Sequence, residues 1–87
     1  MISKTTPSFW RGLARLDATE RDAARSSFRL FAQNPGHNSL HFKKLHGHED
    51  IWSARASLDI RAVAHRDGDT VTWLWIGPHK EFDRLFS

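Results

Sequence analysis

Two histidines and three longer cations between residues 41 and 79 are of the types that act on phosphate esters. They are His41, Lys43, Arg55, Arg61 and His79, and no carboxylate belongs to the set. Histidine gives or takes a proton near neutral pH, and the planar fork of arginine matches phosphate oxygens. Taken singly, each is better explained as a charged side chain in water than as a catalytic residue. The interpretation therefore depends on a fold that brings them together.

The sequence gives little support to other kinds of site. His37, His41, His46 and His48 could suggest zinc, but their spacing matches no compact ligand pattern and the chain has no cysteine. There is no glycine-rich phosphate loop and no serine nucleophile motif, and the segments NPG and DGD are typical of turns. We therefore expect neither a metal nor a cofactor.

Four tryptophans could act as platforms on which nucleic-acid bases stack. In a chain this small, however, hydrophobic packing is the better explanation for Trp10, Trp52 and Trp73. We expect these three side chains in the core.

The first 34 residues predict two helices. One covers Ser8–Leu16, and a second begins near Asp17, where either Asp17 with Glu20 or Thr19 with Asp22 could form a capping pair. Apolar side chains at helical spacing would face the core in both helices. These side chains are Phe9, Leu13, Leu16, Ala24, Phe28 and Phe31.

Three arginines form a row on the opposite side of the second predicted helix. Arg21, Arg25 and Arg29 follow one another at intervals of four residues, a spacing at which like charges repel weakly. The row is either a helix face exposed to water or a surface for an acidic partner.

After Pro35-Gly36 the hydrophobic pattern changes to period two, which predicts strands in the segments SLHFKKL, IWSARASL, IRAVAH and TVTWLWI. In the first three, apolar side chains alternate with the cations, which would lie on the face away from the helices. The fourth is apolar on both faces and is typical of a central strand. Asp67-Gly68 predicts a hairpin turn, and Phe82, Leu85 and Phe86 indicate a short C-terminal helix or turn that packs back.

These elements predict an α+β fold. Two N-terminal helices would pack on one face of a twisted, mainly antiparallel sheet of about four strands, followed by a short C-terminal helix or turn. A short first strand at Ile2–Thr5 is a further candidate.

Length and charge limit the classes of protein to consider. The 87 residues predict a single domain over residues 1–87. Up to Leu45 there are eight Lys and Arg against three Asp and Glu, and this basic excess favours an anionic partner such as nucleic acid or an acidic peptide. The longest apolar run is too short for a bilayer, the N-terminus has no apolar signal segment and cysteine is absent, so we expect a cytoplasmic protein without a membrane partner.

Five segments in a fixed order resemble one protein family. They are Asn34-Pro35, LHFKKL (40–45), WSARAS (52–57), IRAV (60–63) and WIGPHKEFD (75–83). Together they resemble the RelE/ParE superfamily of type II toxin–antitoxin toxins, across Asn34 to Leu85, and the preceding helical pair also fits the family layout.

The resemblance implies a small α/β fold and a cognate antitoxin that wraps around the toxin in a hetero-oligomer. It also implies one of two activities. RelE-like members cleave mRNA in the ribosomal A site without a metal, and ParE-like members inhibit DNA gyrase. Because the toxin is basic, the antitoxin segment that binds it is expected to be acidic, with Arg21, Arg25 and Arg29 as candidate contacts.

The resemblance also implies roles for individual residues. Arg55 and Arg61 match sheet arginines that hold phosphate, and His79 matches a C-terminal histidine that transfers a proton. Lys43 and Lys44 match a basic strand, with Lys43 assigned to catalysis and Lys44 to the RNA backbone. His41 is a further candidate for RNA binding.

The sequence departs from the family pattern at its end, where relatives usually read H-x-x-Y-D. Phe82 replaces the tyrosine and can stack on a base but cannot exchange a proton, and the chain contains no tyrosine at all. We therefore expect a ribosome-dependent mRNA endonuclease that depends on His79. The alternatives are a gyrase inhibitor, or a weakly active member retained as an antitoxin-binding module.

Overall fold

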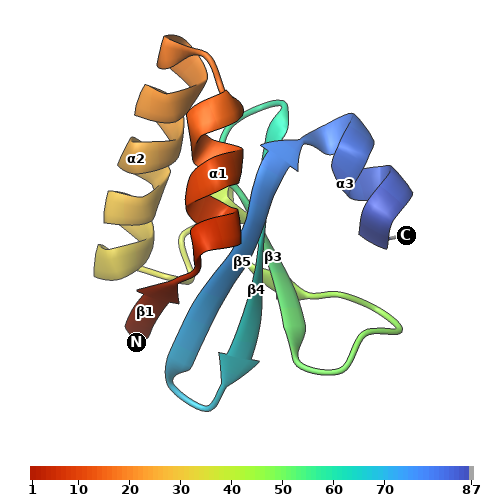
Figure 1. The fold of residues 1–87 in the computed structure, drawn as a ribbon. Coiled ribbons are helices and arrows are strands. Elements are labelled where there is room, and N and C mark those ends of the chain that lie inside the picture. The colour runs from red at the N-terminus through yellow and green to blue at the C-terminus, as the bar shows by residue number, and fades with distance from the viewer. Residues whose placement is uncertain (87) are drawn as a thin grey trace.

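The computed structural model describes residues 1–86 and shows a twisted five-stranded sheet with helices on both faces (Figure 1). Helices α1 and α2 cover one face, and the shorter α3 lies on the other side of the sheet near the C-terminus. The predicted α+β class is confirmed. The elements are β1 (Ile2–Thr5), α1 (Pro7–Arg15), α2 (Ala18–Gln33), the 3-10 turn η1 (Asn38–Leu40), β2 (Lys43–Lys44), β3 (Ile51–Arg55), β4 (Ile60–Asp67), β5 (Thr70–Pro78) and α3 (His79–Phe86).

Both N-terminal helices begin at a side-chain cap. The Thr6 hydroxyl accepts a hydrogen bond from the Phe9 backbone N–H and donates one to the carbonyl of Trp73, which ties the start of α1 to β5. At the start of α2, Asp17 and Glu20 form a reciprocal capping box, so the first of the two predicted capping pairs is the one used. Both starts are therefore specified by local sequence.

The sheet has the strand order β1-β5-β4-β3-β2. Strand β1 runs parallel to β5, and every other neighbouring pair is antiparallel. The predicted count of about four strands was therefore one too low, because the candidate strand at Ile2–Thr5 forms. The predicted strand over SLHFKKL is also shorter than expected: η1 occupies Asn38–Leu40, and only Lys43 and Lys44 pair with β3.

An irregularity in β5 decides which side chains reach the core. Ala64 pairs with Trp73 and Val63 pairs with Trp75, so Leu74 is an extra residue in the ladder. Such a bulge shifts the alternation of faces by one residue. Trp73 consequently packs under α1 and α2, while Trp75 lies on the opposite face beneath α3.

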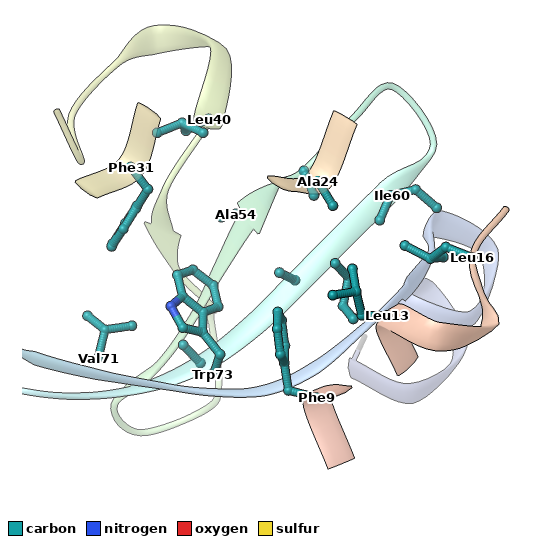
Figure 2. Close-up of a cluster of buried hydrophobic side chains, with 14 residues drawn as sticks. Phe9, Leu13, Leu16, Ala24, Phe31, Leu40, Ala54, Ile60, Val71 and Trp73 are labelled. Atoms are coloured by element: carbon teal, nitrogen blue, oxygen red, sulfur yellow. The ribbon is translucent and has the colours of Figure 1, made fainter. Parts of the chain in front are cut away.

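The core is centred on Trp73, which is 1% exposed (Figure 2). Phe9 and Phe31 from the two helices contact its ring at centroid distances of 6.4 and 5.2 Å. The prediction for Trp10 was wrong, since this side chain is 54% exposed on α1. Trp52 is half-buried and stacks on Phe42 at the edge of the core.

Helix α3 packs back on the sheet through two of the three predicted side chains. The Trp75 ring centroid lies 6.5 Å from that of Phe82 and 5.5 Å from that of Phe86. Leu85 instead points largely into solvent, with 53% of its surface exposed.

Within residues 1–86, no helix has the length and apolar character needed to cross a membrane.

Candidate functional site

A cavity of about 260 Å³ lies between the sheet face away from α1 and α2 and the beginning of α3. It brings together six of the seven residues that the sequence assigned to catalysis or RNA binding. The lining residues are His41, Lys43, Ser53, Ala54, Arg55, Arg61, His79, Phe82 and Asp83.

The two arginines lie opposite each other, because Arg55 on β3 pairs with Arg61 on β4. The Arg61 Nη1 donates hydrogen bonds to the backbone carbonyls of Ser57 and Leu58 in the turn between these strands and of Ile60 at the start of β4, at 3.2, 3.3 and 3.2 Å. Burial lowers the pKa of Arg61, and the positive charge of Arg55 lowers it further. The negative charges of Asp83 and Asp59 raise this pKa, but the net shift is downward. The site thus holds two like charges together before any ligand arrives.

His79 is the first residue of α3, and the turn before β4 holds its position. Its backbone N–H donates a 2.7 Å hydrogen bond to the carbonyl of Asp59. Its Nε2 lies 3.3 Å from a carboxylate oxygen of Asp83, one helical turn later. Sequence reasoning missed Asp83 as a site residue, although its i, i+4 spacing from His79 on a predicted helix could have identified it.

His41 reaches the cavity through an unusual backbone conformation. It follows η1 with a φ of 46°, in the left-handed region, where histidine occurs more often than most residues. Two residues later the chain enters β2, and Lys43 pairs with Ser53. Ser53 is 4% exposed and was also missed, although it shares the sheet face of Arg55 two residues away.

Lys44 is the RNA-site candidate that the structure separates from the others. It pairs with Trp52, whose ring packs on Phe42 at the core side, and it borders an open hollow beside the loop 45–49. His65 lies on the same face as Arg61 but four pairs farther along the ladder, and it is exposed. Both residues therefore make useful controls for the cavity.

The three arginines assigned to a partner also separate. Arg21 and Arg25 border a hollow between α1 and α2 together with Trp10, Leu13 and Ala14. Arg29 lies one turn beyond, where its Nη2 donates to the Ser26 hydroxyl at 3.2 Å. Of the predicted row, Arg21 and Arg25 therefore lie at a groove and Arg29 lies outside it.

The four histidines at positions 37, 41, 46 and 48 do not form a group that could bind a metal. In the part of the chain that the structure describes, no three histidine, aspartate or glutamate side chains come together as potential metal ligands. His37 instead forms a local contact in which its Nδ1 accepts a hydrogen bond from the Ser39 backbone N–H at 3.2 Å.

Comparison with solved structures shows that RelE and YoeB toxins have a similar fold. No protein-family model and no curated protein sequence matches the chain. Three solved structures are similar to it with TM-scores between 0.68 and 0.77. A chain of the RelB-RelE antitoxin-toxin complex from Methanococcus jannaschii has a TM-score of 0.77 at 16% identity, with 97% of this chain and 99% of that chain covered.

Two further structures have slightly higher identity. A chain of the RelBE2 toxin-antitoxin complex from Mycobacterium tuberculosis has a TM-score of 0.69 at 22% identity, covering 88% of this chain and 95% of that one. The YoeB/ParE toxin from Agrobacterium tumefaciens has a TM-score of 0.68 at 21% identity, covering 91% and 99%. The fold that the sequence resemblance predicted is therefore confirmed: the chain adopts the fold of the RelE and YoeB toxins.

Proposed function

We propose that this protein is the toxin of a type II toxin–antitoxin system and that it cleaves mRNA on the ribosome. The observation that carries the proposal is the cavity in which the opposed pair Arg55 and Arg61 meets Lys43 and two histidines. Three adjacent cations suit a phosphate whose negative charge increases in the transition state. The likeness in fold to RelE toxins supports the same activity.

The proposed reaction uses only the RNA and side chains of the cavity. The ribose 2′-oxygen attacks the adjacent phosphorus, the bond to the 5′-oxygen breaks, and the products are a 2′,3′-cyclic phosphate and a 5′-hydroxyl. Arg55, Arg61 and Lys43 stabilise the charge on the phosphorane oxygens. One group takes the 2′-hydroxyl proton, and another gives a proton to the leaving oxygen.

Two imidazoles in one cavity meet the need for two proton carriers. From the sequence alone, His79 is the expected proton carrier, because Phe82 stands where the family pattern has a tyrosine and the chain contains no tyrosine. The cavity adds His41 as a second imidazole. We assign the two proton transfers to His79 and His41, and a stacking contact with a base to Phe82.

The proposed partners follow from the same assignment. Solved structures of similar fold include complexes of RelE with RelB antitoxins, which supports a cognate antitoxin and a hetero-oligomeric complex for this protein. The ribosome and its mRNA would be the targets of the free toxin, and it would act in the cytoplasm.

Primer extension on a reporter mRNA, after the protein is induced without its partner, tests the proposal. We expect growth arrest and cuts at defined codon positions, with neither when Arg55 and Arg61 are both changed to alanine. Intact mRNA together with inhibited supercoiling by purified gyrase would instead establish a gyrase inhibitor. Intact mRNA without arrest would leave an antitoxin-binding module as the function.

A further inference from the structure

A groove of about 260 Å³ on the helical layer lies outside the proposed RNA site. It runs between α1 and α2 and is lined by Trp10, Leu13, Ala14, Arg21 and Arg25. The proposed RNA cavity is lined by residues at the beginning of α3. Helix α3 lies on the other side of the sheet from α1 and α2 (Figure 1). A molecule seated in this groove, which we call the α1–α2 groove, would leave the RNA cavity uncovered.

Trp10 gives the groove an exposed aromatic wall in a fixed position. Its indole N–H donates a 3.0 Å hydrogen bond to the Thr5 hydroxyl, and its ring packs edge-on against Phe9 at 5.6 Å. An exposed but immobilised tryptophan loses little conformational entropy on binding, and tryptophan is enriched among the residues that dominate interface energies. Core packing alone does not explain a side chain that is 54% exposed.

The rim of the groove is cationic. The Arg21 guanidinium donates to the carbonyl of Leu16, which holds it at the groove, and Arg25 forms an exposed 3.8 Å ion pair with Asp22. Between Pro7 and Gln33 there are five arginines and three carboxylates. Exposed ion pairs of this kind contribute little stability, so the arginines remain available to an external carboxylate.

We propose that the α1–α2 groove docks an acidic segment of the partner protein. One apolar side chain of that segment packs against Trp10 and Leu13, and flanking carboxylates pair with Arg21 and Arg25. Identifying this partner as the antitoxin depends on the proposed function, whereas the docking chemistry follows from the groove itself. Arg29 lies outside the contact.

The protein's own tryptophans supply the test. A synthetic helical peptide with leucine at positions i, i+3, i+4 and i+7 and glutamate elsewhere is added to the 15N-labelled protein. We expect the Trp10 indole N–H resonance, assigned with Trp10→Phe, to shift saturably. The resonance of Trp75, which packs beneath α3 on the other face, stays in place. The same peptide with lysine for glutamate should not bind.

Calorimetry with the same peptide gives the energetic test. The double variant Arg21→Glu/Arg25→Glu should weaken binding at least tenfold, and Trp10→Ala about 30-fold, as expected for the truncation of an interface hot spot. Arg29→Glu is the matched control on the same helix and should bind nearly as the wild type does. Equal losses for Arg29→Glu and the double variant, equal binding of the lysine peptide, or no shift at Trp10 would each overturn the proposal.

Two measurements separate this proposal from the proposed function. Trp10→Ala should still cleave reporter mRNA, because the groove and the RNA cavity lie on different faces. If the wild-type protein cuts no mRNA while the acidic peptide still shifts Trp10, the ribonuclease assignment fails and the docking site stands. If mRNA is cut but the peptide does not bind, only the docking site fails. Self-association that buries Trp10 in place of the peptide would also overturn it.

Discussion

Arg55 and Arg61 face each other directly across the antiparallel ladder of β3 and β4. Like charges in opposed positions destabilise a sheet, and the partial burial of Arg61 adds to this cost, as its lowered pKa indicates. A phosphate between the two guanidinium groups would remove the repulsion. The protein without ligand is therefore less stable than it would be without this repulsion. The repulsion lies where we propose that the substrate binds.

The first prediction is that Arg55→Gln stabilises the protein while it abolishes cleavage. Removing one of the opposed charges should raise the free energy of unfolding by about 0.2–1 kcal/mol, which is about 1–8 °C in the melting temperature of a domain of this size. Differential scanning calorimetry at low salt measures the shift. Lys4→Gln, an exposed cation on β1, is the control and should not change the melting temperature. An Arg55→Gln protein that melts below wild type would contradict the repulsion argument.

A second prediction concerns proton transfer by His79. His79→Ala should lower single-turnover cleavage by about 10²–10⁴-fold, the usual contribution of a general acid or base. His65→Ala removes an exposed imidazole from the same sheet face and should cleave as the wild type does. Quench-flow rates on programmed ribosomes provide the comparison. Full activity in His79→Ala would remove this residue from the mechanism.

The neighbouring lysines provide a third prediction. Lys43 lines the cavity that we propose binds RNA, and Lys44 borders the hollow beside the loop 45–49. Loss of a charge-assisted phosphate contact costs about 1.5–3 kcal/mol, so Lys43→Ala should reduce kcat/KM by about 10–150-fold. Lys44→Ala should change it by less than about threefold. Equal effects of the two substitutions would mean that the RNA follows a different path over β2.

A fourth prediction tests the packing of α1 on β5. A Cβ at Gly12 would lie 2.5 Å from the backbone carbonyl oxygen of Ile76, which cannot move without shifting β5. Although alanine favours a helix over glycine by about 1 kcal/mol, we expect Gly12→Ala to destabilise the protein by about 1–3 kcal/mol through this overlap.

Urea unfolding of Gly12→Ala measures that loss. Gly36→Ala is the matched control, because the nearest atom to its added Cβ is 3.7 Å away and its backbone is not left-handed. A Gly12→Ala protein as stable as wild type would show that α1 can move away from β5 at little cost.

The parts of the fold that were predictable depend on local periodicity. The helical spacing of Phe9, Leu13 and Phe31 and the capping residue Asp17 are sequence-local signals, and all of them hold in the structure. The turn at Asp67-Gly68 is also local, and Gly68 has the positive φ that such a turn requires.

The sequence-based predictions were wrong where packing between distant segments determines the structure. The length of the strand before Lys43 depends on how η1 packs against β3. The exposure of Trp10 depends on which side of α1 packs against Trp73. No local pattern predicts the extra residue Leu74 in β5. Each of these features is set by residues far apart in the chain, and period alone carries no information about them.

The chemical groups of the candidate site could be identified from the amino-acid sequence. The sequence has cations and histidines on one predicted strand face, contains no tyrosine, and has His79 immediately after Gly77-Pro78, where the strand ends. These follow from residue identity and from the two-residue period of a strand. Its resemblance to RelE and ParE toxins also predicted the fold correctly.

Which of those groups come together depends on the folded structure. The strand register sets Arg55 against Arg61, the left-handed turn at His41 brings a second imidazole to the cavity, and the Asp59–His79 hydrogen bond positions α3. Strand register and helix docking depend on contacts between distant segments, because they minimise the exposed apolar surface of the whole chain. The convergence of charges on one cavity is therefore a property of the folded protein.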